Sequence, residues 1–340
     1  MIRFITYDTP SLHNDIEIYK KEFNNFTFEI VIMERKPRNI KRLSNVHINL
    51  FLENIPNKFK QFYPAKYNLF MPNLEFFRAY DEVKHINTIL CKTKEAYDYF
   101  QSYALEHNCN FTCHYTKFYS IIPSEIKLQE KNPNLFICLA GNSFFKNVEY
   151  VVECWIKYKC FLEYDPLIEL HITCYNMCWD KVYPQIKDKL IITDGIIKYN
   201  NLYIYTKRPE YEYYVKLLST ANMSICISRK EGYGHYINEA RYFNTWIISM
   251  DNPPMNELVI DKVNGSLLKD KTNYYPQREG NTKWKLYNAI PNIDELAEHI
   301  IYCIKHKAII NKNNLSRKMF DEDKEYFVNK MKSITATLKN

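Results

Sequence analysis

Two glutamates, Glu231 and Glu239, bracket a short turn that contains Gly232 and Gly234. A carboxylate can accept two hydroxyl hydrogen bonds at once, so such a pair suits a ligand that carries several hydroxyl groups. The apolar run 223–227 precedes the turn and a helix-compatible run follows it. Strand, glycine turn and helix together present backbone N–H groups and a positive helix end to an anion. The expected chemistry is therefore binding of an anion, with a carboxylate on either side that can accept hydroxyl groups.

The elements around this turn follow the alternation of an α/β protein. Short apolar runs alternate with helix-compatible segments, which predicts a parallel sheet with ligands outside the carboxyl ends of its strands. The pattern breaks between residues 122 and 133, which indicates a linker. Strands are expected at 2–6, 28–33, 46–51, 67–71, 88–91, 111–115, 135–140, 167–173, 190–193, 202–205, 223–228 and 246–250. Helices are expected at 15–23, 94–105 (capped by Thr93), 148–156, 211–218, from about Tyr236, and at 292–304 and 327–338.

Composition narrows the class of protein. A chain of 340 residues favours two domains, and 46% hydrophobic with 25% charged residues indicates a globular protein. The net charge of +7 fits either a lysine-rich solvated surface or a basic cleft for a phosphorylated ligand. There is no long Lys/Arg block and no nucleic-acid-binding motif, so nucleic acid is not expected as a partner.

The ten cysteines are expected to be buried free thiols in a reducing compartment. Cys109 and Cys113 with His114, and Cys174 with Cys178, have only loose metal-like spacing, and we predict no metal site. The chain starts without an apolar signal region and no apolar run reaches about 18 residues. A cytoplasmic protein, soluble or peripheral and without a transmembrane segment, is therefore expected.

From Asn134 to about residue 305, half of the chain, the order of features resembles the retaining glycosyltransferases of the GT-B fold, in particular family 4. The segment 231–239, E-G-Y-G-H-Y-I-N-E, resembles the E-G-F-G-x-P-x-x-E segment of that family. Gly141 with Lys146, the segments 202–208 and 217–222, and the segments 252–259 and 264–268 follow in the matching order.

This resemblance implies an α/β protein of GT-B fold, with two Rossmann-like parallel-sheet domains facing a cleft. Residues 1–130 would form the acceptor domain and residues 131–317 the donor domain, while residues 318–340 would form a last helix that crosses back to the first domain. The glycine-rich loop that follows the first strand in the family is absent, since residues 8–14 stand there. The family often contacts the donor sugar with a histidine of this half, and the candidates His13, His85 and His114 remain open.

The resemblance also implies roles for individual residues. Glu239 would bind the ribose hydroxyls, Glu231 the transferred sugar, and Lys146 the leaving diphosphate, so that Glu231 and Lys146 are the catalytic pair. The nucleotide sugar is then a substrate, and no cofactor or metal is required. The remaining donor-binding candidates are Gly141, Asn142, Lys207, Arg208, Gly232, Tyr233, Gly234, His235 and Tyr236.

The sequence departs from the family at the phosphate turn and at the donor sugar. Asn142 stands where the family has arginine and Asn147 where it has glycine, so Lys207 or Arg208 is the candidate second cation. His235 and Tyr236 replace an apolar residue and a proline. Whether His235 contacts the donor through its backbone or its imidazole is left open.

Two functions remain in view. The first is transfer of a hexose or N-acetylhexosamine from a nucleotide-diphosphate sugar, UDP favoured and GDP next, to a hydroxyl of a glycan, lipid or protein acceptor, with retention and without metal. The second is a degenerate protein of the same fold that binds nucleotide sugar or glycan without transfer. Plainer interpretations make Glu231 a helix-capping acid and Glu239 an exposed helix residue. Residues 321–323, Asp-Glu-Asp, imitate a metal-binding aspartate pair, but we expect a solvated charge run at the start of the final helix.

Overall fold

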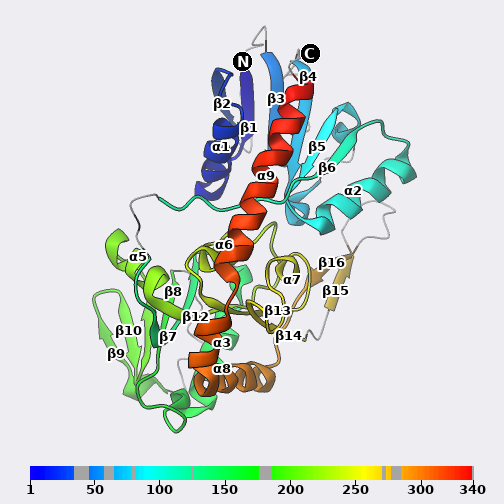
Figure 1. Cartoon of the computed structure of the whole chain (residues 1–340). Helices are drawn as coiled ribbons and strands as arrows, with labels where there is room; N and C mark the ends of the chain where they lie inside the picture. The colour runs from blue at the N-terminus through cyan, green and yellow to red at the C-terminus, as the bar shows by residue number, and fades with distance from the viewer. Residues whose placement is uncertain are drawn as a thin grey trace. The chain divides into compact units, whose positions relative to one another are not determined.

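The computed structural model describes residues 1–33, 46–56, 65–78, 81–123, 126, 128–175, 186–269, 273–276 and 285–338. These residues form two compact units (Figure 1). Met1–Ile121 and the residues from Glu322 onward belong to unit 1, whereas Ile122–Pro276 and Lys285–Asp321 belong to unit 2. Each unit is built on a Rossmann-like sheet whose strands are mainly parallel, with helices on its faces.

Unit 1 contains a six-stranded, wholly parallel sheet in the order β2-β1-β3-β4-β5-β6. Its order changes direction between β1 and β3, since β2 lies on one side of β1 and the later strands on the other. The strands are β1 (Ile2–Thr6), β2 (Phe28–Ile32), β3 (Val46–Glu53), β4 (Ala65–Pro72), β5 (Thr88–Cys91) and β6 (Thr112–Tyr115). The helical elements are α1 (Pro10–Glu22), η2 (Leu74–Phe76), η3 (Glu82–His85) and α2 (Lys94–His107).

Caps fix the helix starts in unit 1. Thr93 caps α2 as predicted, because its hydroxyl accepts a hydrogen bond from Ala96 N at 3.1 Å. Helix α1 begins at Pro10, five residues before the expected start. The cause is Thr9, whose side chain accepts from Leu12 N, followed by a proline in the first helical position, where the missing N–H is not needed.

The last helix, α9 (Ser316–Leu338), packs in unit 1 through its residues from Glu322 onward. Phe327 contacts the ring of Phe118 edge-on at 5.1 Å, and Leu338 O lies 2.8 Å from His47 Nε2. The charge run 321–323 does not begin this helix, which starts at Ser316. Asp323 is buried and forms an ion pair with Lys117, so the expectation of a solvated charge run is wrong for that residue.

Unit 2 contains an eight-stranded sheet in the order β14-β13-β12-β7-β8-β11-β10-β9. Its strands are β7 (Asn132–Gly141), β8 (Glu169–Cys174), β9 (Ile191–Thr193), β10 (Ile196–Tyr199), β11 (Leu202–Tyr205), β12 (Ala221–Cys226), β13 (Trp246–Met250) and β14 (Gly265–Leu268). A separate antiparallel pair is formed by β15 (Asn273–Pro276) and β16 (Lys285–Asn288). The helical elements are η4 (Phe144–Lys146), α3 (Val148–Lys157), η5 (Lys159–Phe161), η7 (Lys187–Lys189), α5 (Tyr211–Thr220), α6 (His235–Tyr242), α7 (Met255–Leu258) and α8 (Ile293–Asn313).

The predicted parallel sheet of unit 2 carries an antiparallel edge. Strand β10 pairs antiparallel with both β9 and β11. Two-residue connections join these strands, and Gly195 (φ 77°) and Asn200 (φ 51°) adopt positive φ in them. The Asp194-Gly195 dipeptide is a hairpin signal that the sequence interpretation passed over.

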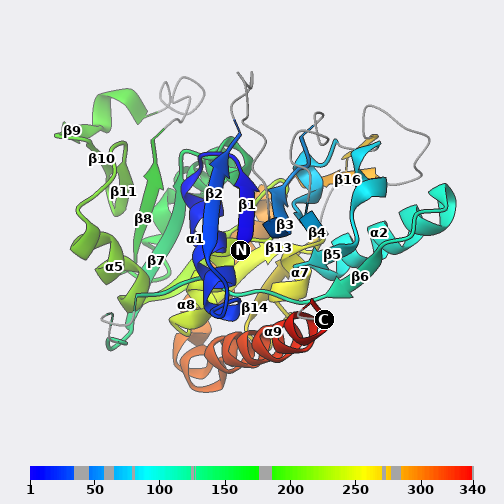
Figure 2. The same cartoon turned by 90° about the horizontal axis from the view of Figure 1, so that it is seen from above.

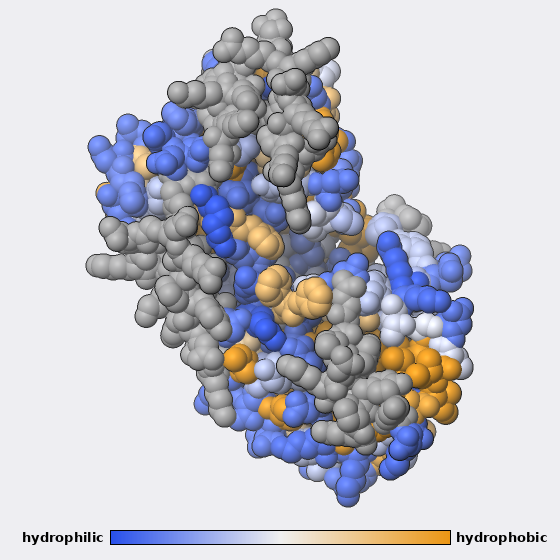
Figure 3. All heavy atoms as spheres, turned by 180° about the vertical axis from the view of Figure 1, so that it is seen from behind, coloured by the Kyte–Doolittle hydropathy of each residue, from blue (hydrophilic) through white to orange (hydrophobic). Residues whose placement is uncertain are grey.

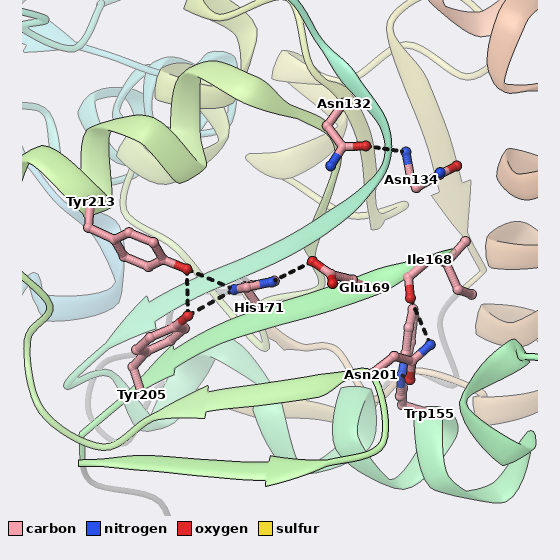
Figure 4. A network of polar contacts seen from close by, with 9 residues as sticks. All are labelled: Asn132, Asn134, Trp155, Ile168, Glu169, His171, Asn201, Tyr205 and Tyr213. Carbon is pink, nitrogen blue, oxygen red and sulfur yellow. Dashed lines mark hydrogen bonds and ion pairs between the residues drawn. The ribbon is translucent and has the colours of Figure 1, made fainter. Parts of the chain in front are cut away.

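Buried polar contacts hold the faces of this sheet (Figure 4). His171 Nδ1 lies 2.9 Å from the hydroxyl of Tyr205, which in turn lies 2.8 Å from the hydroxyl of Tyr213 on α5. Burial lowers the pKa of His171, so its neutral form is favoured between these phenols. Trp155 of α3 donates to Asn201 Oδ1 at 3.0 Å. The network ties α5 to strands β8 and β11 and thereby fixes the turn between β11 and α5.

Hydrophilic side chains cover most of the coloured surface in Figure 3. Helix α2 lies beside strands β5 and β6 of the unit 1 sheet (Figure 1 and Figure 2). None of the helices in the described ranges combines the length and the apolar character that crossing a membrane requires.

Candidate active site

The turn after β7 carries the first part of the candidate site. Gly141 ends the strand with φ +58°, and Asn142 follows it in an exposed position. The hydroxyl of Ser143 accepts from Phe145 N at 3.3 Å and starts the short helix η4, whose last residue is Lys146. The turn therefore presents Lys146 where the resemblance expects the phosphate cation, and an uncharged side chain where it expects arginine.

Asn147 connects this turn to the end of β12. It is fully buried with φ 53°, a left-handed conformation that asparagine tolerates better than most residues. Its Nδ2 donates to Ile227 O at 2.8 Å and to Ala289 O at 3.1 Å, and its Oδ1 accepts from Arg229 Nε at 2.9 Å. From the sequence, Asn147 was noted only as the replacement of a family glycine. Because asparagine tolerates the left-handed conformation, it could have been expected to keep the same turn.

Lys146 and Glu231 form a largely buried ion pair, with 13% and 12% of the two side chains exposed. The Lys146 ammonium also lies over the ring of Tyr236, 3.6 Å from its centroid. The Tyr236 hydroxyl is hydrogen-bonded to Ser228 Oγ, and burial raises its pKa well above the usual range, so the phenol remains neutral. The structure thus brings together Lys146, Glu231 and Tyr236, and adds Ser228, which the sequence did not single out.

Helix α6 begins at His235, one residue before the expected start, with Gly234 as its N-cap. Gly234 has φ +100°, and a Cβ there would lie 3.2 Å from Leu258 Cδ1, so the position requires glycine on both counts. Gly234 O accepts from Ile237 N and Asn238 N at 3.1 and 3.0 Å. The first N–H groups of a helix lack intrahelical acceptors, which leaves this end suited to an anion.

Glu239 lies one turn along α6 from His235 and is largely buried, so it is not the exposed helix residue of the plainer interpretation. Burial raises its pKa, while the charges of His235 and Lys146 lower it. Among the residues that the structure describes, none donates a hydrogen bond to the side-chain carboxylate of Glu239 or forms an ion pair with it. A carboxylate that is withdrawn from water without a hydrogen-bond donor is suited to accept hydroxyl groups of a ligand.

The two proposed second cations are placed differently. Lys207 Nζ forms an ion pair with Asp194 Oδ1 at 2.7 Å, and both side chains are largely exposed. Arg208 is also exposed, and its charge lowers the pKa of Tyr214, which burial and then the charge of Glu239 raise well above the usual range. The charges of both Arg208 and Glu239 are therefore felt at Tyr214.

At the remaining residues of the glycine turn, the main chain is the part presented to the candidate site. Tyr233 is only 3% exposed, and its ring packs edge-on against that of His235 at 5.2 Å. The predicted donor contact of Tyr233 is therefore restricted to its main chain, as at Gly232. His235 points its ring toward Tyr233 and its charge is sensed by Glu239.

The candidate histidines all belong to unit 1. His13 pairs with Asp8 at 2.9 Å on an exposed surface, and burial lowers the pKa of His114. Among the described residues, no group of three or more His, Cys, Asp and Glu side chains could hold a metal ion. Cys109 and Cys113 are free thiols, while Cys178 lies outside the described residues.

Comparison with known proteins gives one sequence match and several structural ones. Residues 198–275 match the sequence model of a family described as glycosyl transferases group 1. No curated protein matches the chain by sequence.

The structural neighbours share the fold at low sequence identity. A glycosyltransferase from Rickettsia africae ESF-5 aligns with TM-score 0.64 and 10% identity over 100% of this chain and 99% of its own. Sucrose-phosphate synthase from Thermosynechococcus elongatus aligns with TM-score 0.63 and 10% identity over 99% of this chain and 98% of its own. A variant of S. aureus TarM in complex with Fondaparinux, alpha-GlcNAc-glycerol and UDP aligns with TM-score 0.56 and 13% identity over 86% of this chain. The alignment covers only 55% of the TarM chain. The group 1 match covers residues 198–275, and the structural neighbours show that the chain shares their fold.

Proposed function

We propose that this protein transfers a hexose or N-acetylhexosamine from a nucleotide-diphosphate sugar to an acceptor hydroxyl, with retention of configuration and without a metal ion. The observation that carries the proposal is the grouping of Lys146, Glu231 and Glu239 around the N-terminus of α6. Lys146 and the helix end can bind the diphosphate, and each of the two carboxylates can accept hydroxyl groups on one side of it.

The roles divide along the turn. Lys146 and the N–H groups at the start of α6 stabilise the charge that develops on the leaving diphosphate. Glu231, held beside Lys146, orients the transferred sugar. Glu239 accepts the ribose hydroxyls, and its present lack of a described donor leaves both oxygens for that purpose. The UDP of the TarM neighbour and the frequent use of UDP in the resembling family favour a UDP-sugar, with a GDP-sugar as the next choice.

The decisive experiment incubates the protein with a panel of UDP- and GDP-sugars and measures release of the nucleoside diphosphate. A thermal-shift screen on the same panel detects binding, since a ligand that binds only the folded state raises the melting temperature. The anomeric configuration of a product, determined by NMR, tests retention, and undiminished turnover in EDTA tests metal independence. Failure of every nucleotide sugar both to bind and to turn over would refute the proposal.

A second function is binding without transfer. The observation in its favour is that Asn142 supplies no charge at the family's arginine position and that Lys207 is directed to Asp194. Such a protein would show a thermal shift with a nucleotide sugar but no release of nucleotide, with glycan acceptors present or absent.

We infer a reducing, cytoplasmic setting, which is supported by buried thiols such as Cys226, whose pKa burial raises to about 12.

A further inference from the structure

A second polar cluster lies in unit 1, where the order of its sheet changes direction. Strand β1 has β2 on one side and β3 on the other, so its switch point falls between β1 and β3. In open parallel sheets, ligands bind outside the carboxyl ends of the strands at such a point. Tyr7 follows β1 directly and Glu53 is the last residue of β3. The candidate active site of unit 2 uses neither residue.

Glu53 is held in an unusual backbone conformation. Its φ of 70° lies in the left-handed region, which residues with a side chain seldom adopt. The next residue, Asn54, fixes the turn, because its Oδ1 accepts from Ile55 N at 2.9 Å and its Nδ2 donates to Phe76 O at 3.1 Å. Strain of this kind persists only where the surroundings enforce it, and it gathers at ligand sites.

The side chains of this cluster have unused hydrogen-bonding capacity. Asn73 Nδ2 donates to Glu53 Oε2 at 3.1 Å, whereas no donor among the described residues reaches Oε1. Burial raises the pKa of Glu53. The parallel register of β1 on β3 pairs Ile5 with Phe51, which places Tyr7 beside Glu53, and the pKa of Tyr7 is raised by burial and then by the charge of Glu53. Within the described ranges, the hydroxyl of Tyr7 has no hydrogen-bond partner either.

The charges around Glu53 select against ionic ligands. Lys92 and Asp15 form a buried pair at 3.2 Å, with 2% and 1% of their side chains exposed. Lys92 lowers and Asp15 raises the pKa of Glu53, so both charges are felt there. The carboxylate of Glu53 repels an anion, and the charge of Lys92, which lowers the pKa of Glu53, offsets part of its attraction for a cation. A neutral hydroxyl group, which can donate to Glu53 and exchange a hydrogen bond with Tyr7, meets neither penalty.

We propose that Glu53 and Tyr7 form a binding site for a neutral, hydroxyl-rich ligand, a sugar residue, with Asn73 as the residue that positions Glu53. The site belongs to unit 1 alone and does not require the nucleotide. That the sugar bound there is the acceptor of transfer rests on the proposed function, whereas binding itself does not.

The test is saturation-transfer NMR with the methyl glycosides of glucose, galactose and N-acetylglucosamine, on the full chain. Glu53→Gln keeps an oxygen for Asn73 but removes the charge, and Tyr7→Phe removes one hydroxyl. We expect each to weaken glycoside binding by about 10- to 100-fold, the range of a hydrogen bond to a charged group. The matched control is Glu17→Gln, which alters an exposed α1 residue paired with Lys20 and should leave binding unchanged within about twofold. The proposal would be overturned if the wild-type protein did not bind the glycosides, or if both site variants bound them as tightly as the wild-type protein does.

A nucleotide-sugar thermal shift on the same variants separates this site from the proposed function. An unchanged shift in Glu53→Gln, together with lost glycoside binding, supports a separate sugar site. A shift that disappears in Glu53→Gln contradicts it, because the residue would then serve the donor. If the wild-type protein binds glycosides through Glu53 but no nucleotide sugar, the proposed function fails and the sugar site stands.

Discussion

Two turns at the carboxyl edge of the eight-stranded sheet each carry a lysine paired with an acidic side chain. In the turn after β7, Lys146 pairs with Glu231, and about one eighth of each side chain is exposed, 13% and 12%. In the turn after β11, Lys207 pairs with Asp194, and 71% and 95% are exposed. The first pair is fixed further by Asn147, Tyr236 and Ser228, whereas the second spans a hairpin connection.

The two lysines are therefore unequal as phosphate ligands, although the sequence offered both. Surrounded by solvent, Lys207 is screened and its pair contributes little. Lys146 acts where water is largely excluded, and its charge is felt by Glu239 and Cys226 as well as by Glu231. Electrostatic stabilisation is strongest in such a place. Four predictions test this contrast.

The largest effect is expected from Lys146→Met. It removes the charge that stabilises the leaving diphosphate, and we expect turnover to fall by about 10²–10³-fold or more. It also leaves Glu231 buried without its partner, which costs about 3–5 kcal/mol of unfolding free energy. Denaturant unfolding and nucleotide release are measured together. Lys146→Met with Glu231→Gln should regain much of the stability but no turnover; recovered turnover would contradict the role of Lys146.

Glu231→Gln should lower turnover by about 10²–10³-fold while nucleotide binding stays nearly intact, because the carboxylate serves the sugar and not the diphosphate. Single-turnover rates and UDP titration measure the two quantities. Glu149→Gln is a matched control, since Glu149 pairs with Arg229 at 2.6 Å in the first turn of α3. Turnover equal to that of the wild-type protein would remove Glu231 from the reaction.

Glu239→Gln should weaken nucleotide affinity by about 10- to 100-fold, because a charged acceptor for the ribose hydroxyls is lost. The same substitution should stabilise the folded protein at neutral pH, although it weakens nucleotide binding. Burial raises the pKa of Glu239 in the folded protein, so the stability that this group contributes is present below its unfolded value of 4.5 and is lost as pH rises through the folded pKa. The variant should therefore melt higher than the wild-type protein at pH 7 to 8, by roughly 2–4 °C for each kcal/mol relieved.

The difference in melting temperature should shrink as the pH approaches 4.5, where the wild-type carboxyl is protonated in both states. A calorimetric series from pH 4.5 to 8 without nucleotide measures it. A lower melting temperature of the variant at every pH would mean that Glu239 is paired, contrary to the contacts described here.

The smallest effect is expected from Lys207→Met. An exposed ion pair contributes between about 0 and 1 kcal/mol, so unfolding should change little, and turnover should remain within about threefold. A hundredfold loss would show that Lys207 leaves Asp194 to bind the diphosphate, and the contrast between the two turns would fail. Arg208→Met, tested beside it, asks whether the neighbouring guanidinium supplies the second charge instead.

Local patterns predicted much of the fold. The alternation of apolar runs placed most strands within two residues, and Thr93 was recognised as a cap because that interaction is made within one turn. The antiparallel β9–β10–β11 edge was missed although Asp194-Gly195 marks it. The start of α1 was missed because Thr9 and Pro10 were taken for a loop.

By itself the sequence determined that Glu231, Gly234 and Glu239 share one strand-turn-helix unit, since residues so close along the chain cannot separate. It also placed Lys146 at the end of another strand. Only the tertiary structure decided that Lys146 meets Glu231 and Tyr236, that Asn147 joins the two turns, and that Lys207 turns to Asp194. The contacts of Lys146 and Asn147 join residues 80 or more positions apart, whereas Lys207 and Asp194 are 13 positions apart. Their energies depend on burial and on which neighbours the sheet order brings alongside, and neither is written in the local pattern.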